Sequence, residues 1–378
     1  MVTSWRCAAS LPDLANVADR RSARRAALSD KLAEQQVDAL LLGSLPNIRY
    51  LTGFSGSSAL VIATRSDLLL LSDFRYETQA AEEAGDLASV RIESTSLWTG
   101  LWGALPKLQG IEVIGFESAH LVHRDFQRLL SEGTRWQWRP QIGLVEDLRE
   151  SKDEDEVALI TEAGRIAIRA LERVLPEVTP GLSELEVAGI LEKALRDEGS
   201  EESPFPPIVA SGPRAALPHA RPSGRVIERG DFLLLDFGAQ HHGYCSDITR
   251  TVVVGKATGE QREVYEIVRE ANRIATSSVR AGMTGMAADT LARSYIERRG
   301  HGNGFGHSLG HGLGLEVHEA PRLAKTADTA LKEGAVVTIE PGIYRAGWGG
   351  VRIEDDVHIS PAGPRILTDF SRELLEVA

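Results

Sequence analysis

Four acidic residues in the second half of the sequence lie where extended segments end or begin. Asp236 follows the apolar run FLLL, and Glu340 follows the run AVVTI. Asp247 and Glu354 each lie in a second extended stretch, after a polar or glycine-rich turn region. Each Asp or Glu pair therefore predicts a β-hairpin. Directly opposed residues of antiparallel strands point to the same face, with Cβ atoms about 5 Å apart.

The expected turns fix the pairing of these acids. A turn at His241-His242 places Asp236 opposite Asp247, and a turn centred on Gly347 places the two glutamates opposite each other. Four carboxylates would then meet at one place, and such a cluster is costly unless cations neutralise it. Two hard divalent metal ions suit four carboxylates. The alternative is a set of separate surface acids, which is less expected at the ends of strongly apolar strands.

A glycine-rich segment holds four of the ten histidines. Residues 301–318 read HGNGFGHSLGHGLGLEVH, and the histidines are His301, His307, His311 and His318. Imidazole is the side chain best suited to metal ligation and to proton transfer near neutral pH. Glycine lets the backbone approach an ion or a substrate closely. This density indicates a functional loop.

The same segment contains the pattern G-x-S-x-G around Ser308, which is typical of serine-hydrolase nucleophiles. That pattern needs an apolar strand before it and a helix after it. Here RRGHGNGF precedes it and HGLGL follows it, so neither context is expected. A serine hydrolase is therefore an alternative that the sequence disfavours.

The elements that must position these residues repeat along the chain. Residues 230–238 and 334–342 share one pattern, a glycine, an apolar strand, an acid and a second glycine. Helical periodicity precedes each hairpin, with capping-box spacing at Ser151/Glu154 and Ser183/Glu186 and later helices near 260–280 and 286–299. A duplicated helix–helix–hairpin unit is the natural inference.

The charge run RESKDEDE separates two stretches that differ in their pattern of helical and extended segments, and it predicts a domain boundary. Residues 1–148 alternate helical and extended signals, which is typical of an α/β domain, and residues 149–378 form the second domain. Expected elements of the first domain are a helix at 20–35 and strands at 37–42, 59–64, 68–73 and 111–117. Residues 1–19 could be a disordered lead-in.

Composition excludes several classes of function. The formal net charge is −12, which disfavours nucleic acid or an anionic membrane as the main partner. The only cysteines, Cys7 and Cys245, cannot form a disulfide framework or a four-thiolate zinc site. No apolar run approaches the roughly 20 residues of a membrane span, and the N-terminus lacks a secretory signal pattern. We expect a cytoplasmic protein.

Taken together, the motifs resemble one enzyme family. The second half contains DFG followed by Asp247, then GHSLGHGLGLEVHE, IEPGIY and VRIEDD, and it closely resembles the pita-bread metallopeptidases. It is similar to their aminopeptidase P and prolidase branch. LPNIRYLTGFSGSSALVI and SDFRYETQA resemble the N-terminal domain of that branch. The implied fold is a creatinase-like α/β N-terminal domain followed by an α+β pita-bread catalytic domain with pseudo-twofold duplication.

The resemblance also implies roles for individual residues. The implied ligands of two divalent ions are Asp236, Asp247, His311, Glu340 and Glu354. Manganese is the expected metal, with zinc or cobalt as alternatives. The implied catalytic and substrate-binding residues are His219, His307, His318, Tyr344 and Arg352, with Glu340 as the proton shuttle. From the residues alone, Arg352 and Glu354 are two apart and share one face of a strand. The alternative role of Arg352 is an ion pair with Asp356, and the alternative role of Tyr344 is packing.

The implied reaction is hydrolysis of the bond between an N-terminal residue and a following proline, with a metal-bridged hydroxide as nucleophile. An aminopeptidase P is the leading interpretation, because the text from Ser203 onward is nearer to small two-domain aminopeptidases P. Prolidase, which cleaves only the dipeptide, is the alternative. A metal-free binding protein on the same fold is a more distant alternative. The family also implies a homodimer.

Overall fold

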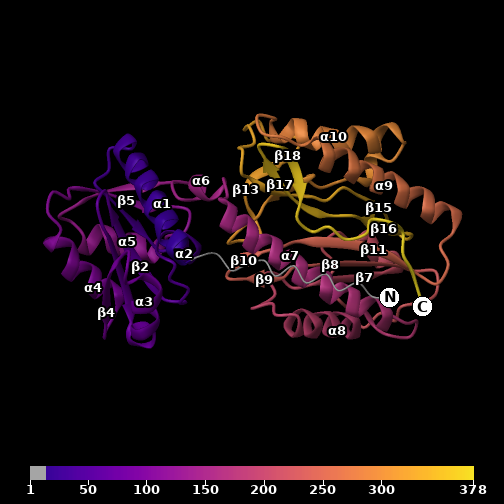
Figure 1. Cartoon of the computed structure of the whole chain (residues 1–378), viewed down its shortest axis with the longest axis horizontal. Coiled ribbons are helices and arrows are strands. Elements are labelled where there is room, and N and C mark those ends of the chain that lie inside the picture. The colour runs from indigo at the N-terminus through magenta and orange to yellow at the C-terminus, as the bar shows by residue number, and fades with distance from the viewer. Residues whose placement is uncertain (1–13) are drawn as a thin grey trace. The chain divides into compact units, whose positions relative to one another are not determined.

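Residues 14–378 are described by the computed structural model, and they separate into two units between Arg149 and Glu150 (Figure 1). This division lies one residue from the boundary expected from the sequence. Residues 1–13 of the expected lead-in lie outside the described residues, whereas residues 14–19 begin helix α1. Each unit is described by itself below.

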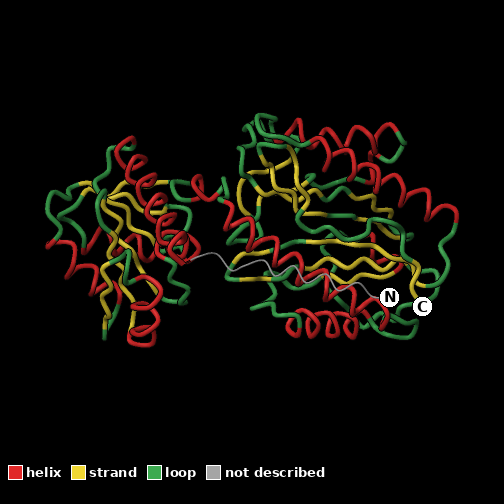
Figure 2. Tube along the Cα trace, in the orientation of Figure 1, coloured by secondary structure: helices red, strands yellow, loops and turns green. Residues whose placement is uncertain are grey.

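The first unit is built on a six-stranded sheet with the order β4-β3-β2-β1-β5-β6. Strands β1, β2 and β3 are antiparallel neighbours, whereas β1–β5, β5–β6 and β3–β4 pair in parallel. Helices connect the consecutive parallel strands β3 to β4 and β5 to β6 (Figure 2), which confirms the α/β expectation. The strands are β1 Ala39–Leu42, β2 Ala59–Thr64, β3 Leu68–Asp73, β4 Ser89–Glu93, β5 Val113–Glu117 and β6 Gln137–Gln141, and the helices are α1 Leu14–Glu34, α2 Leu45–Thr52, α3 Glu77–Ala84, α4 Leu97–Ala104, α5 His123–Glu132 and α6 Glu146–Arg149.

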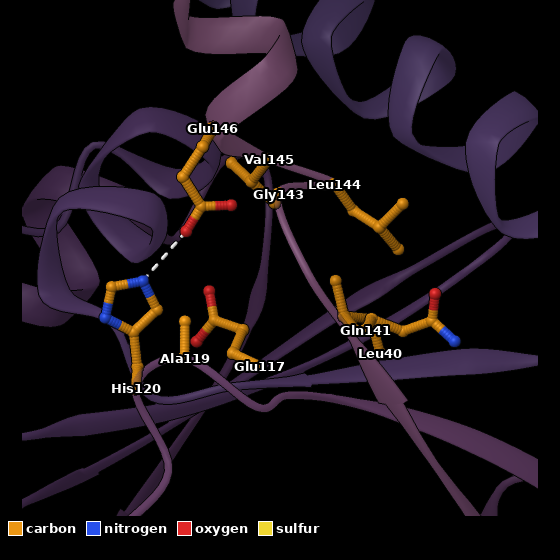
Figure 3. Close-up of a pocket in the computed structure, with 9 residues that line it drawn as sticks. All are labelled: Leu40, Glu117, Ala119, His120, Gln141, Gly143, Leu144, Val145 and Glu146. Carbon is orange, nitrogen blue, oxygen red and sulfur yellow. Dashed lines mark hydrogen bonds and ion pairs between the residues drawn. The ribbon is translucent and has the colours of Figure 1, made fainter. Parts of the chain in front are cut away.

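A buried acid cluster in this unit is internally satisfied. Glu117, at the end of β5, accepts hydrogen bonds from the backbone N–H groups of Gly43 and Ser44 at 2.7 and 2.8 Å, and from Asn47 Nδ2 at 2.6 Å. These donors lie at the start of α2, where unpaired N–H groups need an acceptor. Glu146 binds His120 close by (Figure 3). Burial raises the pKa of Glu117, but its carboxylate has a full set of donors and needs no cation.

Four long helices frame the strands of the second unit: α7 Glu154–Val174, α8 Glu184–Asp197, α9 Gly259–Ser278 and α10 Gly285–Arg298. Apolar side chains of α7 and α8 form one core with β8 and β11, and those of α9 and α10 form another with β14 and β17. In Figure 1, α8 and the α9–α10 pair lie on opposite sides of the strands. Among the described helices, none is long and apolar enough to cross a membrane.

The strands of this unit form two main sheets, ordered β19-β11-β8-β7 and β13-β12-β14-β17-β18. Each helix pair is followed by an antiparallel strand pair, β8–β11 in the first half and β14–β17 in the second. The duplicated helix–helix–hairpin arrangement is therefore present. The strands are β7 Ile208–Ser211, β8 Phe232–Phe237, β9 Gln240–His241, β10 Tyr244–Cys245, β11 Ile248–Val254, β12 Gly310–Gly312, β13 Glu319–Leu323, β14 Val336–Ile339, β15 Gly342–Arg345, β16 Gly349–Arg352, β17 Asp355–Ser360, β18 Gly363–Ile366 and β19 Glu376–Val377.

One predicted capping box is confirmed and the other is wrong. Ser183 and Glu186 form the reciprocal box at the start of α8. At α7 the box is formed by Asp153 and Glu156, not by Ser151 and Glu154. The Ser151 hydroxyl instead donates to the carbonyl of Glu333 at 2.9 Å. Asp153 wins because its carboxylate accepts two backbone N–H groups, those of Asp155 and Glu156, each at 3.0 Å.

We predict that Asp153→Ala lowers the free energy of unfolding by about 1 kcal/mol, the usual value of a helix N-cap. Ser151→Ala is the matched control, and its effect should stay within about 0.5 kcal/mol, as expected for an exposed site. Urea unfolding followed by circular dichroism measures both. Equal destabilisation by the two changes would contradict the assignment of the cap to Asp153.

Candidate metal centre

The four predicted acids line one open cleft in the second unit. The cleft has a volume of about 1250 Å³, and Asp236, Asp247, Glu340 and Glu354 all face it. Asp236 lies on β8 and Asp247 directly precedes β11, whereas the glutamates flank β14 and β17. The two hairpins therefore deliver their acids to a common space, as the sequence predicts.

The first hairpin differs in register from the prediction. Asp236 pairs with Thr249, so Asp247 lies two residues further toward the turn than a direct partner would. The turn residues are His242 and Gly243, with φ of 46° and 77°, not His241-His242. A two-residue type I′ hairpin turn needs positive φ at both central positions, and glycine adopts positive φ most easily. Asp247 still faces the cleft because residues two apart on a strand share a face.

The second hairpin has the predicted register. Ile339 pairs with Asp355 in the larger sheet, and Gly342 pairs with Arg352 in the short β15–β16 ribbon. Both pairings belong to one register, whose turn lies at Gly347, and they place Glu340 across from Glu354. The sheet is interrupted at the two glutamates themselves, so their side chains lie at a break between ribbons.

His311 lies on β12, beside the acids. Its Nδ1 lies 3.0 Å from the Gly312 carbonyl oxygen, which fixes this nitrogen as the donor. Its Nε2 lies 3.8 Å from Asp247 Oδ2 and 3.6 Å from Glu340 Oε1. Burial lowers the pKa of His311 to about 4, so the imidazole is neutral near pH 7 and Nε2 presents a lone pair. A hydrogen bond of this kind on the other ring nitrogen is typical of metal-ligating histidines.

The electrostatics of the acid cluster favour a bound cation. Burial raises the pKa of Asp247 and of Glu340 well above the usual range, and the neighbouring carboxylates add to it. Burial likewise raises the pKa of Glu354 to about 8, and it raises the pKa of Asp236 although the charge of Arg352 opposes the shift. Carboxylates this close resist full ionisation unless positive charge joins them.

One carboxylate oxygen in the cluster has no hydrogen-bond donor. Asp247 Oδ1 is buried and unpartnered, in contrast to the fully bonded Glu117 of the first unit. One ligand atom each from Asp247, His311 and Glu354 lies within 4.8 Å of the others. A buried acceptor without a donor costs about 1–3 kcal/mol, so it calls for a cation. The oxygen-rich donor set, with one imidazole, fits hard or borderline divalent ions.

Arg352 is fully engaged beside this cluster. Its guanidinium binds Asp236 and donates to Thr249 Oγ1 at 3.0 Å and to Tyr344 Oη at 2.8 Å. The alternative pairing with Asp356 is wrong, because Asp356 accepts the Asp247 backbone N–H at 3.0 Å instead. Arg352 is therefore placed to hold the acid cluster in position.

Tyr344 and His307 continue this hydrogen-bonded chain into the cleft. Tyr344 Oη lies 2.9 Å from His307 Nε2, and His307 Nδ1 lies 2.8 Å from the Ser308 carbonyl oxygen. Burial raises the pKa of Tyr344 to about 12 and lowers that of His307 to about 4. Tyr344 thus has a polar contact in addition to its packing, and His307 is neutral near pH 7.

The structure brings together most of the other predicted residues, with one exception. His219 and His318 are exposed and line the cleft, and the His318 ring centroid lies 4.4 Å from that of His311. His301 does not line the cleft, because it follows α10 and precedes the turn of residues 302–304. Ser308 lines the cleft but is followed by β12, so the strand-turn-helix setting of a nucleophilic serine is absent there.

Sequence reasoning missed the residues behind the ligands. Asn272, buried on α9, donates through Nδ2 to the carbonyls of Ile339 and Ile353 at 3.0 and 3.1 Å. These carbonyls belong to the residues immediately before Glu340 and Glu354. One amide thereby bridges the break in the sheet where both glutamates lie. A polar residue on the apolar face of a helix was the available signal.

Comparisons with known proteins point in the same direction. Residues 158–361 match metallopeptidase family M24, and residues 24–151 match the creatinase/prolidase N-terminal domain. The chain is 39% identical to a Pyrococcus horikoshii protein named Xaa-Pro dipeptidase, over 90% of this chain and 95% of the relative.

Two solved structures share the whole architecture. A Bacillus anthracis Xaa-Pro dipeptidase matches with a TM-score of 0.90 and 40% identity, over 94% of this chain and all (100%) of that one. A Thermotoga maritima X-Pro aminopeptidase matches with a TM-score of 0.86 and 37% identity, over 93% of this chain and 98% of that one. These likenesses extend across both units and confirm the predicted fold class.

We predict that Asn272→Ala weakens the affinity for Mn²⁺ by about 10–100-fold, the usual effect of losing a group that orients metal ligands. Competition with a chelating dye measures this affinity without any assay of activity. Thr276→Ala is the matched control, since this buried hydroxyl, one turn further along α9, bonds only within its own helix. Unchanged affinity in Asn272→Ala, or an equal loss in both variants, would contradict the assignment.

Proposed function

The chain belongs to metallopeptidase family M24, and from that premise we propose that it is an Xaa-Pro dipeptidase. The convergence of four acids and one neutral imidazole in a single cleft is the observation that carries this proposal. The relatives from P. horikoshii and B. anthracis named as Xaa-Pro dipeptidases support the dipeptide as substrate. The T. maritima structure named as an X-Pro aminopeptidase keeps aminopeptidase P as the second candidate.

This proposal reverses the order of preference that the sequence motifs suggested. Those motifs favoured aminopeptidase P, whereas the named relatives favour the dipeptidase. The two activities differ only in whether the cleft accepts peptide chain beyond the proline. Arg221 and Arg322 line the cleft in addition to the buried Arg352, and an arginine side chain can pair with the free carboxylate that a dipeptide presents.

We assign the binding of two divalent ions to five residues: Asp236, Asp247, His311, Glu340 and Glu354. The unpartnered Asp247 Oδ1 and the neutral His311 support this assignment. Bound ions would supply Lewis-acid polarisation of the peptide carbonyl and a lowered pKa for an attacking water. Manganese is our first choice on the oxygen-rich ligand set, with zinc and cobalt as alternatives.

The chain's own residues would then orient the peptide and move protons. Glu340 faces the cleft, and we assign it the transfer of a proton from the attacking water to the leaving proline nitrogen. His219 and His318 face the cleft and can donate to the oxygen of the tetrahedral intermediate. His307 also faces the cleft as a substrate-side residue, with its Nδ1–H directed to the Ser308 carbonyl and its Nε2 accepting from the Tyr344 hydroxyl. Arg352 and Tyr344 keep Asp236 and His307 in position.

Proline after the scissile bond sets a particular requirement. Its nitrogen carries no N–H and its φ is restricted, so a peptidase that relies on that N–H binds it poorly. In our proposal the cleft selects the pyrrolidine ring by shape.

We also propose a homodimer, which light scattering can test directly.

Replacing Asp247 tests the metal assignment. We expect Asp247→Asn to lower both Mn²⁺ affinity and Xaa-Pro hydrolysis by more than about 100-fold, because changes outside the ligand shell already cost about 10–100-fold. Metal analysis of the purified variant and its kcat/KM are the measurements. Ser308→Ala is the control and should leave both near their wild-type values. Full activity of Asp247→Asn, or an inactive Ser308→Ala, would contradict the proposal.

A substrate series decides between the two peptidases. We expect kcat/KM for Xaa-Pro to exceed that for Xaa-Pro-Xaa by at least about tenfold, because a site built around a free carboxylate rejects its absence. Assays of both peptides with each candidate metal give this ratio. Equal or faster cleavage of the tripeptide would make the chain an aminopeptidase P.

Less than one ion per chain after manganese loading, with no hydrolysis, would favour the alternative of a metal-free binding protein.

A further inference from the structure

A buried ion pair on α10 lies behind the histidine loop. Asp289 and Arg293 are one helical turn apart, with side chains only 1% and 7% exposed. The pairing is bidentate: Arg293 Nε lies 2.6 Å from Asp289 Oδ2, and Nη2 lies 2.7 Å from Oδ1. We call these two residues the α10 pair.

The α10 pair forms hydrogen bonds with the backbone of the loop at His307 and on both sides of it. Arg293 Nη1 donates to the Phe305 carbonyl at 2.8 Å, and Nη2 donates to the His307 carbonyl at 2.7 Å. Asp289 Oδ1 accepts the Leu309 N–H at 3.0 Å. The guanidinium carbon also lies 4.0 Å from the centroid of the Phe305 ring. Three alternate residues of one loop are thus fixed by a single pair.

These three hydrogen bonds restrain a glycine-rich segment whose backbone would otherwise be poorly constrained. Gly306 lies between the bonded residues and Gly310 follows them, and glycine has more backbone freedom than any other residue. The His307 side chain in turn reaches Tyr344 at 2.9 Å, inside the cleft. Holding the loop therefore fixes where the imidazole can reach.

Stability alone is a weak reason for such a pair. Taking two charges out of water is costly, and well-packed apolar residues often replace a buried ion pair without loss of stability. Here the guanidinium instead supplies two donors, and the carboxylate one acceptor, to loop backbone groups. An apolar pair of similar volume would fill the space but could not make these three hydrogen bonds.

We propose that Asp289 and Arg293 are positioning residues that set the His307 imidazole for the reaction. This inference rests on the proposed function, in which His307 lines the cleft and accepts a hydrogen bond from the Tyr344 hydroxyl beside the reacting peptide. Loss of the pair should lower kcat more than it raises KM, because a displaced imidazole would leave the cleft able to bind the peptide but would misplace Tyr344 beside the reacting bond. Mispositioning by about 1 Å is enough for a loss of about 100-fold.

A double-mutant cycle tests the inference. The variant Asp289→Leu/Arg293→Met replaces the pair by apolar residues, and it is combined with His307→Ala. We expect a loss of about 100-fold in kcat in the otherwise wild-type chain and less than about threefold in the His307→Ala background, since residues acting as a unit are not additive. Additive losses, or wild-type kcat in the apolar variant, would overturn the inference.

Two controls separate positioning from general damage. The exposed Glu270–Arg273 pair on α9 receives the matching change, Glu270→Leu/Arg273→Met, which should leave kcat unchanged. Arg293→Lys covers a failure of the apolar variant to fold. It keeps the charge beside Asp289, but one ammonium cannot reproduce the guanidinium fork. We expect it to stay folded and to lose about tenfold in kcat, and an unchanged kcat would overturn the inference.

The measurements also distinguish this inference from the proposed function. Hydrolysis of Xaa-Pro by the wild-type chain is measured first, and its absence would count against the function itself. With an active wild type, Mn²⁺ content of each variant is measured beside kcat. Metal content equal to wild type with reduced kcat supports positioning, whereas a parallel loss of metal and kcat overturns it.

Discussion

Mutual repulsion among buried carboxylates is the constraint around which the second unit is organised. Four acids face one cleft, and burial together with their neighbours raises the pKa values of Asp247, Glu340 and Glu354. Arg352 offsets this repulsion at Asp236, and cations would have to offset the rest. The first unit solves a similar problem differently, since Glu117 is surrounded by N–H donors. Glu117 and Asp247 are both buried, and the supply of donors around the carboxylate is what differs between them.

Much of this arrangement could be predicted from residue type and spacing. Apolar runs ending in an acid located both hairpins, and the glycine-rich Gly347 turn gave the correct register for Glu340 and Glu354. The register of Asp236 was wrong because two adjacent histidines looked like a turn centre, whereas positive φ requires the next pair, His242 and Gly243. At α7 the spacing rule accepted Ser151, although Asp153 competed better for the same N–H groups.

The contacts of the supporting residues could not be predicted, because their partners are backbone atoms distant in sequence. Asn272 bridges the carbonyls of Ile339 and Ile353, and Arg293 donates to the carbonyls of Phe305 and His307. Any residue type could supply such carbonyls, so the sequence gives no sign of which ones are meant. Only the packing of α9 and α10 against the sheet and the loop selects them.

The unequal registers of the two hairpins have one further consequence. The halves repeat the same elements, yet the aspartates are offset along their ribbon while the glutamates lie directly across from each other. A peptide runs from an amino end to a carboxyl end, and a cavity of perfect twofold symmetry would receive it equally well in either sense. The offset gives the cavity a polarity of its own, so that head and tail of an incoming chain meet different surroundings.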